Sequence, residues 1–377
     1  MKIGTLTFHR ACNSGAVLQA YALERALNSI EGVQAEIIDY SCEKIDYAYT
    51  SAFCFYNCNL LKGFLKYLIR CKSIRNRNNQ FMDFRKKYLT ISKKKYDKNT
   101  IMDADQEYDL VICGSDQIWN YELTNSDTTY LLDFVKDSDK KASYAVSFGI
   151  SEIDETHKIE YKNLIDEYRY LSMRETSASE IVSALINREC KVHIDPVFLQ
   201  TSEEWSQLCK TLKEKNYVLI YMVGMGRIVD EMIDFAKMLA RQNNLELLFM
   251  NTEYIPYLYA DIKHIKNVAP DMFLSYIKEA EYIVTNSFHA TCFSILFHKQ
   301  FYTETGAKEA GGKKSGRVIN LLEKSGLSHH IINKGKLIHD QHKKDDWDLV
   351  DKIIEDEANI SLHYLQEIVR ERKQYNE

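Results

Sequence analysis

Short apolar runs alternate with amphipathic segments along most of the 377-residue chain. Runs rich in β-branched and aromatic residues predict strands at 2–8, 33–39, 108–113, 141–148, 171–173, 217–223, 246–250 and 282–285, with an edge-like strand at 301–305. Apolar positions three and four apart predict helices at 16–27, 155–168, 177–186, 229–241, 271–279, 347–357 and 361–371. This alternation is typical of parallel sheets with helices on their faces, so the predicted fold class is α/β.

The pattern restarts after a charged run at 210–216, which indicates a second domain. We predict two Rossmann-like domains, at 1–205 and 206–335, with a cleft between them and C-terminal helices at 336–377. A chain of 377 residues is long enough for two domains of ordinary size, and a hydrophobic content of 45% is enough for packed cores.

A basic amphipathic insertion at about 58–100 interrupts the first domain. One interpretation is a patch that contacts anionic lipid or a lipid-linked substrate at the membrane surface. The other is an ordinary helix with a solvated basic face, which packs on the sheet through Phe81, Phe84 and Leu89.

Charge and cysteine content narrow the class of protein. A net charge of -5 argues against nucleic acid as a partner. Nine scattered cysteines, an odd number without paired CxxC motifs, favour free thiols over a zinc site, so no metal is predicted. The start of the chain resembles no signal peptide, and no run of 18 apolar residues occurs. We therefore expect a cytoplasmic location, with the inner face of the membrane as an alternative.

The segment 282–297 contains the leading candidate for catalysis. A short strand ends at Asn286 and Ser287, and a helix follows from Ala290, so His289 lies where a strand end meets a helix start. Ligands bind at such places in open α/β sheets, and a helix N-terminus favours anions. A histidine there can transfer protons near neutral pH. The alternative is a capping turn, in which Ser287 or Asn286 caps the helix and His289 only satisfies backbone groups.

Two other predicted strand ends contain polar residues. Asn13 and Gly15 follow the first strand and could direct N–H groups at a phosphate or carboxylate, although a plain tight turn explains them equally well. The dinucleotide motif GxGxxG is missing from this loop. Polar and aromatic residues after strand 108–113 could bind sugar hydroxyls and stack on a sugar ring, or could instead cap a turn and fill the core. They are Ser115, Asp116, Gln117 and Trp119.

Two arginines complete the candidate site. Arg174 directly follows strand 171–173 and could bind a carboxylate or phosphate in bidentate fashion. Its alternative role is a structural ion pair with Glu175 or Asp195. Arg317 begins a helix after a Gly- and Lys-rich loop at 306–316.

Seven spaced segments together resemble the polysaccharide pyruvyl transferase family, from Lys2 to about Leu327. They are TFHRACNSGAVLQAYAL at 7–23, YDLVICGSDQIWN at 108–120, KASYAVSFG at 141–149, SMRE at 172–175, HIDPVFL at 193–199, AEYIVTNSFHATCFSILF at 280–297 and RVINLLEKSGL at 317–327. The resemblance implies two Rossmann-like domains arranged as in a GT-B glycosyltransferase. It also implies transfer of a pyruvyl group from phosphoenolpyruvate, the donor substrate, to a sugar as a ketal, with no other cofactor.

The resemblance also assigns roles to single residues. It makes His289 an active-site residue, gives Arg174 a part in donor binding and brings Arg317 to the site. In this hypothesis the two arginines bind the phosphate and carboxylate of the donor, and His289 is the acid/base. Ala290 stands where the family motif has glycine, and alanine would disfavour a turn with positive φ.

Other functions remain open at this point. The expected acceptor is a sugar or lipid-linked saccharide of a cell-surface or exopolysaccharide precursor. The alternative enzyme is a GT-B-type glycosyltransferase using a nucleotide sugar, with Glu253 or Glu304 as the ribose-binding carboxylate. A non-catalytic scaffold that retains the fold is a third reading, and the joint presence of His289, Arg174 and Arg317 argues against it.

Overall fold

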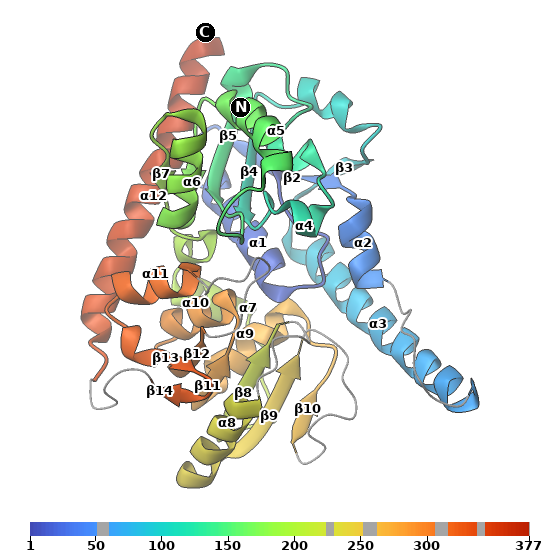
Figure 1. Ribbon diagram of the computed structural model, residues 1–377, viewed down its shortest axis with the longest axis vertical. Coiled ribbons are helices and arrows are strands. Elements are labelled where there is room, and N and C mark those ends of the chain that lie inside the picture. Colours follow the sequence, from blue (N-terminus) through green and yellow to red (C-terminus); the bar gives the residue numbers. More distant parts are fainter. Residues whose placement is uncertain (51–59, 224–229, 252–261, 306–315, 338–343, 377) are drawn as a thin grey trace.

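Two seven-stranded sheets, each with helices against it, make up the molecule (Figure 1). The computed structural model describes residues 1–50, 60–223, 230–251, 262–305, 316–337 and 344–376. The strand orders are β3-β2-β1-β4-β5-β6-β7 and β10-β9-β8-β11-β12-β13-β14. All paired strands run parallel except β13 and β14. The predicted α/β class with two Rossmann-like halves is confirmed.

In the first sheet, β1 is an inner strand between β2 and β4. Its strands are β1 (Lys2–Leu6), β2 (Gln34–Tyr40), β3 (Ile91–Tyr96), β4 (Leu110–Asp116), β5 (Lys141–Val146), β6 (Ser172–Met173) and β7 (Lys191–Val192). The helices of this half are α1 (Ser14–Asn28), α2 (Glu43–Thr50), α3 (Leu60–Tyr88), α4 (Tyr121–Thr124), α5 (Glu155–Asp166), α6 (Thr176–Ile186) and α7 (Ser202–Leu208). Short 3-10 turns are η1 (Ile101–Gln106), η2 (Thr128–Leu131), η3 (Ser138–Lys140) and η4 (Pro196–Leu199).

The second sheet repeats this plan. Its strands are β8 (Tyr217–Met222), β9 (Glu246–Asn251), β10 (Lys263–Ile265), β11 (Tyr282–Thr285), β12 (Gln300–Glu304), β13 (Ile331–Asn333) and β14 (Lys336–Leu337). Its helices are α8 (Asp230–Asn243), α9 (Pro270–Glu279), α10 (Phe288–Leu296) and α11 (Gly316–Lys324), with the turn η6 (Ser328–His330). The predicted edge strand at 301–305 is an inner strand instead, because β13 pairs beyond it. With three residues, β13 is too short for a sequence pattern.

The end of the chain forms one 30-residue helix, α12 (Trp347–Asn376), rather than the two predicted helices. Neither Gly nor Pro separates the two apolar patterns, so nothing in the sequence stops the helix. Figure 1 shows α12 running along both halves of the molecule. Its Leu365 and Ile368 are buried against the first sheet, and Tyr364 donates its hydroxyl to the Ser143 carbonyl at 3.1 Å.

One hydrophobic cluster joins the two halves. Val17 and Leu18 of α1 share it with Phe273 and Ile277 of α9 and with Phe293 of α10. Because these side chains come from both sheets and are fully buried, separating the halves would expose apolar surface. The shared cluster therefore fixes how the helix starts of the two halves face each other.

The basic insertion contains α3, which projects from the body of the molecule in Figure 1. Phe81, Phe84 and Leu89 are buried in the shared cluster, as the ordinary-helix interpretation requires. Side chains at 60–70 lie outside the description, so the membrane-surface interpretation stays a prediction. Within the described residues, no helix combines the length and apolar character needed to cross a bilayer.

Candidate active site

The site forms where strand ends of both sheets meet helix starts. Gly15 lies in the first turn of α1 and His289 in the first turn of α10. A Cβ placed on Gly15 would overlap the imidazole and would lie 2.7 Å from the Cβ of His289. Only glycine therefore allows the two helix starts to approach this closely, and Gly15 lies against His289.

Asp195 is the buried anion at the centre of the site. Its Oδ1 accepts from the backbone N–H of Val197 and so caps η4. Its Oδ2 accepts from Nη1 of Arg174 at 2.7 Å and from the Ser115 hydroxyl at 3.4 Å. Nε2 of His289 lies 3.6 Å from the same oxygen. This carboxylate therefore connects the predicted histidine of one half to the predicted arginine of the other.

Arg174 directly follows β6 and is buried, with 2% of its side chain exposed. Besides Asp195, it lies 3.6 Å from Oδ1 of Asp116 and 3.8 Å from Oε2 of Glu175. Its predicted alternative, a structural ion pair with Glu175 or Asp195, is therefore present. Because three carboxylates lie within 4 Å, the guanidinium mainly balances negative charges of the protein itself.

These charges set the ionisation of the pair. Burial alone would raise the pKa of Asp195, but the charges of His289 and Arg174 outweigh burial and hold it well below its usual value. Burial lowers the pKa of Arg174, while Asp195, Asp116 and Glu175 raise it further above its ordinary range. Asp195 is therefore an anion at neutral pH.

His289 is itself buried, with 8% exposure. Among the described residues, none forms a hydrogen bond with its Nε2. The nitrogen lies beside the Asp195 carboxylate, 3.6 Å from its Oδ2, which is beyond hydrogen-bond distance.

Phe288 brings the two predicted arginines together. The Arg174 guanidinium lies 4.5 Å and the Arg317 guanidinium 5.8 Å from the centre of its ring, distances that allow cation–π attraction. Arg317 is the second residue of α11 and is largely buried. When the amide oxygen of Gln117 faces Arg317, it accepts from both Nη1 and Nη2. Gly149 leaves room for this amide, because a Cβ there would overlap it.

A cavity opens beside these residues, between the halves. Its walls include Arg174, Asp195, Phe288 and Arg317, with Ile354 of α12 on one side. The cleft predicted between the two domains is therefore present, and cations from both halves line it.

The remaining predicted residues support the backbone. Asn13 caps α1, accepting from the N–H groups of Gly15 and Ala16, so its side chain occupies the donors predicted for an anion. Ser287 caps α10 by accepting from Ala290, as the capping interpretation proposed. The Ser115 hydroxyl is fully buried and donates to the Ala145 carbonyl at 2.6 Å.

At the end of β4 one expectation is corrected, and of the two alternatives for Trp119 the core position is confirmed. The strand continues to Asp116, so Ser115 and Asp116 belong to the strand rather than to a loop beyond it. Trp119 is fully buried and donates Nε1 to the Tyr130 carbonyl at 3.0 Å. It packs among aromatic rings of the core, including Phe148 and Tyr168, and is therefore not a surface for stacking sugar. Asp116 and Gln117 remain at the site.

Ala290 fits its position without strain. It lies in the first turn of α10 and is fully buried, and helical φ is negative. Alanine in place of the motif's glycine is therefore compatible with this backbone.

Sequence reasoning missed the central role of Asp195 and the role of Phe288. Asp195 was considered only as a possible ion-pair partner of Arg174, and Phe288 was given no role. The Asp-Pro pair at 195–196 was an available signal, because aspartate before a first-turn proline is a helix cap.

The paired α/β halves, the cleft and the helix α12 that spans both define a GT-B-type enzyme fold. The chain belongs to the polysaccharide pyruvyl transferase family, whose model matches residues 13–303. The chain is thus a transferase of polysaccharide biosynthesis. No curated protein matches it.

Solved structures with a similar fold include a putative UDP-N-acetylglucosamine 2-epimerase from Listeria monocytogenes, with a TM-score of 0.52, 9% identity and coverage of 97% of this chain and 90% of that one. The UDP-GlcNAc 2-epimerase of Methanocaldococcus jannaschii has a TM-score of 0.48 and 13% identity, and the match covers 98% of this chain and 99% of that one. The E. coli heptosyltransferase WaaC has a TM-score of 0.39 and 10% identity, and the match covers 83% of this chain and 91% of that one. At these identities the likeness concerns the fold alone.

The carboxylates considered for a nucleotide sugar gain no support. Glu304 is buried, and its Oε2 accepts from the backbone N–H of Gly335 at 3.1 Å. Glu253 lies outside the described residues.

Proposed function

We propose that this chain transfers a pyruvyl group from phosphoenolpyruvate to a sugar of a cell-surface or exopolysaccharide precursor, forming a pyruvate ketal. The supporting observation is the joint placement of His289, Asp195 and two arginines where the halves meet. Family membership supplies the reaction class.

The two arginines take different roles in this proposal. Arg317 lies at the start of α11 and on the cavity wall, and we assign it to the phosphate or carboxylate of the donor. Arg174 lies within 4 Å of three carboxylates and chiefly fixes Asp195. It contributes to donor binding through its positive charge at the cavity wall. Gln117 and Asp116, at the edge of the same site, are assigned to sugar hydroxyls.

The proposed reaction has two steps. The oxygen of one sugar hydroxyl forms a bond to C2 of phosphoenolpyruvate, and C3 takes a proton and becomes a methyl group. A second hydroxyl of the same sugar then forms the second C2–O bond, while the C2–O bond to phosphate breaks and inorganic phosphate leaves. His289 supplies the proton for C3 and accepts protons from the hydroxyls, with Asp195 stabilising the imidazolium between transfers.

Isothermal titration with phosphoenolpyruvate tests the donor. Wild type should bind, Arg317→Ala should bind at least about 10-fold more weakly, and His289→Gln should bind within a few-fold of wild type, because charge-assisted contacts dominate donor binding. Lys158→Ala, a change of an exposed cation on α5, serves as the control. His289→Gln should also lose phosphoenolpyruvate-dependent phosphate release measured with acceptor sugars. Heat with a UDP-sugar and none with phosphoenolpyruvate would instead identify a nucleotide-sugar glycosyltransferase.

A further inference from the structure

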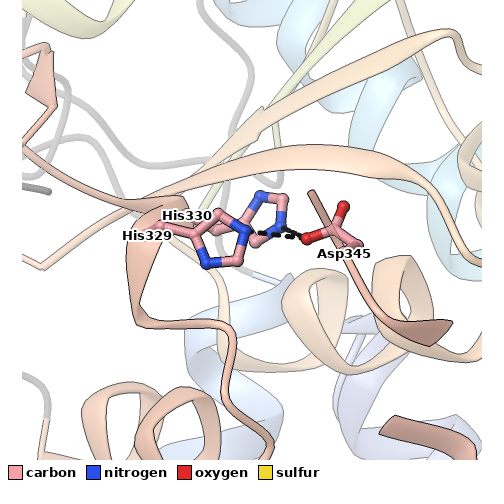
Figure 2. A group of neighbouring side chains, drawn as sticks. All are labelled: His329, His330 and Asp345. Atoms are coloured by element: carbon pink, nitrogen blue, oxygen red, sulfur yellow. Dashed lines mark hydrogen bonds and ion pairs between the residues drawn. The ribbon is translucent and has the colours of Figure 1, made fainter. Parts of the chain in front are cut away.

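Away from the active site, two histidines and an aspartate converge on one point (Figure 2). Nε2 of His329 lies 2.8 Å and Nε2 of His330 lies 2.7 Å from the same oxygen, Oδ1 of Asp345. The side chains are 9%, 3% and 4% exposed, so the group is buried. The histidines are in η6, ahead of β13, and Asp345 lies two residues before α12.

The hydrogen bond on the far side of His330 decides which nitrogen carries a proton. Nδ1 of His330 lies 2.6 Å from the carbonyl oxygen of Phe301 on β12. A carbonyl only accepts, so Nδ1 is the protonated nitrogen. In the neutral ring of His330, Nε2 then carries a lone pair that points at the carboxylate oxygen of Asp345. Two acceptors at 2.7 Å repel each other, so a positive charge must lie between or on them.

We propose that this charge is a divalent transition-metal ion of the zinc class, bound by Nε2 of His329, Nε2 of His330 and Oδ1 of Asp345. Imidazole nitrogen with one carboxylate is a donor set that zinc and its neighbours accept, whereas Mg²⁺ and Ca²⁺ prefer oxygen alone. The three ligand atoms all lie within 4.8 Å of one another. Tetrahedral bonds of about 2.0–2.1 Å require ligand atoms roughly 3.3 Å apart, so the two histidine–aspartate distances open by about half an ångström on binding.

The surroundings match those of metal ligands in proteins. A ligating histidine normally donates its other N–H to a carbonyl or carboxylate, as Nδ1 of His330 does to Phe301. A ligating carboxylate is normally held by a further donor, and Nε2 of Gln300 donates to Oδ2 of Asp345 at 2.8 Å. That bond occupies the second oxygen and leaves Oδ1 for the ion.

The position of the site indicates a structural role. It joins β12 and the start of β13 in the second sheet to the segment that leads into α12, and α12 packs on the first sheet. A bound ion would therefore anchor the base of the helix that spans both halves. This inference does not depend on the proposed transfer reaction, because its readout is metal binding.

The test is titration of the chelator-treated, full-length protein with Zn²⁺. Wild type should bind one ion saturably and gain thermal stability, because the ion binds the folded state. His330→Gln and Asp345→Asn should each bind at least about 100-fold more weakly, and Gln300→Leu about 10-fold more weakly, following the losses typical of ligands and their supports. Mg²⁺ should give no heat.

His298→Gln is the matched control, since Nε2 of His298 contacts Asp351 at 2.7 Å in a second, more exposed histidine–aspartate pair nearby. It should keep wild-type affinity. His329→Gln provides a second ligand variant should His330→Gln fold poorly by circular dichroism. Zinc binding that is unchanged in both histidine variants, or its absence in wild type, overturns the proposal and leaves a charged imidazolium paired with Asp345.

Discussion

Gly15 and His289 touch across the two halves of the molecule, at the first turns of α1 and α10. No side chain fits between them, because a Cβ on Gly15 would lie inside the imidazole ring's contact distance and 2.7 Å from the Cβ of His289. The orientation of the candidate acid/base is thus set by the backbone of the opposite half. Substitutions at this contact should alter catalysis through the position of the ring.

Gly15→Ala should impair transfer much more than it impairs folding. The added methyl must displace the imidazole or separate the helix starts, and overpacking of this kind costs about 1–3 kcal/mol. We expect at least about a 10-fold fall in turnover, measured as phosphoenolpyruvate-dependent phosphate release, with a smaller change in donor affinity. Gly316→Ala is the control, because among the described residues its Cβ would meet only the Ser177 hydroxyl, at 3.7 Å. Equal activity of Gly15→Ala and wild type would contradict the contact.

Asp195→Asn should destabilise the protein and change its response to acid. Removing this charge leaves the Arg174 guanidinium buried without its 2.7 Å partner, and breaking a buried pair costs about 3–5 kcal/mol. The pKa of Asp195 is lowered in the folded state. Its contribution to stability is therefore complete above the unfolded value of about 3.9 and is lost as pH falls through the lower folded pKa.

Urea unfolding between pH 7 and pH 2 measures both effects. The free energy of unfolding of wild type should fall steeply below about pH 4. For Asp195→Asn this free energy should be lower at pH 7 and should fall less over the same pH interval. Asp356→Asn, at an exposed position on α12, is the control for the general effect of removing a carboxylate. Parallel pH profiles for wild type and Asp195→Asn would show that the pair contributes no pH-dependent stability.

The fold was largely predictable because most of its strands are short, β-rich or apolar runs. β8 and β11 could be predicted directly from the sequence, since strands buried on both faces of a parallel sheet are almost continuously apolar. β13 and β14 have three and two residues and carry no such pattern, which is why β12 was placed at an edge. Two helices were predicted in place of α12, although neither Gly nor Pro separates them.

The candidate site was predictable only in part. His289, Arg174 and Arg317 lie where strand ends and helix starts imply, and the structure brings them together around Phe288. Asp195 was not identified as the central anion, because its role depends on contacts with residues 21 and 94 positions away in the chain. Contacts between residues so far apart in the chain produce no local sequence pattern from which they could be predicted. The roles of Asn13 and Ser287 as caps likewise emerge only from their hydrogen bonds.

Arg317→Lys should retain more donor binding than Arg317→Ala. Lysine keeps the positive charge at the start of α11 but loses the two-pronged geometry, so affinity for phosphoenolpyruvate should fall about 10-fold or less. Arg317→Ala removes the charge and should therefore lower the affinity for phosphoenolpyruvate more than Arg317→Lys does. Titration calorimetry at two salt concentrations checks this order, and the lysine variant should show the steeper salt dependence. Equal losses in both variants would show that geometry, rather than charge, decides donor binding.

Leu365→Ala tests whether α12 holds the first half of the molecule. Leu365 is fully buried against the first sheet, so its truncation leaves a cavity that costs about 2–5 kcal/mol. Leu349→Ala changes the same side chain on the same helix, where it is 52% exposed, and should cost less than about 0.5 kcal/mol. Urea denaturation of both variants measures the difference. If the two substitutions cost the same, α12 is not packed on the first sheet in solution, and the cavity wall it provides at Ile354 would be lost as well.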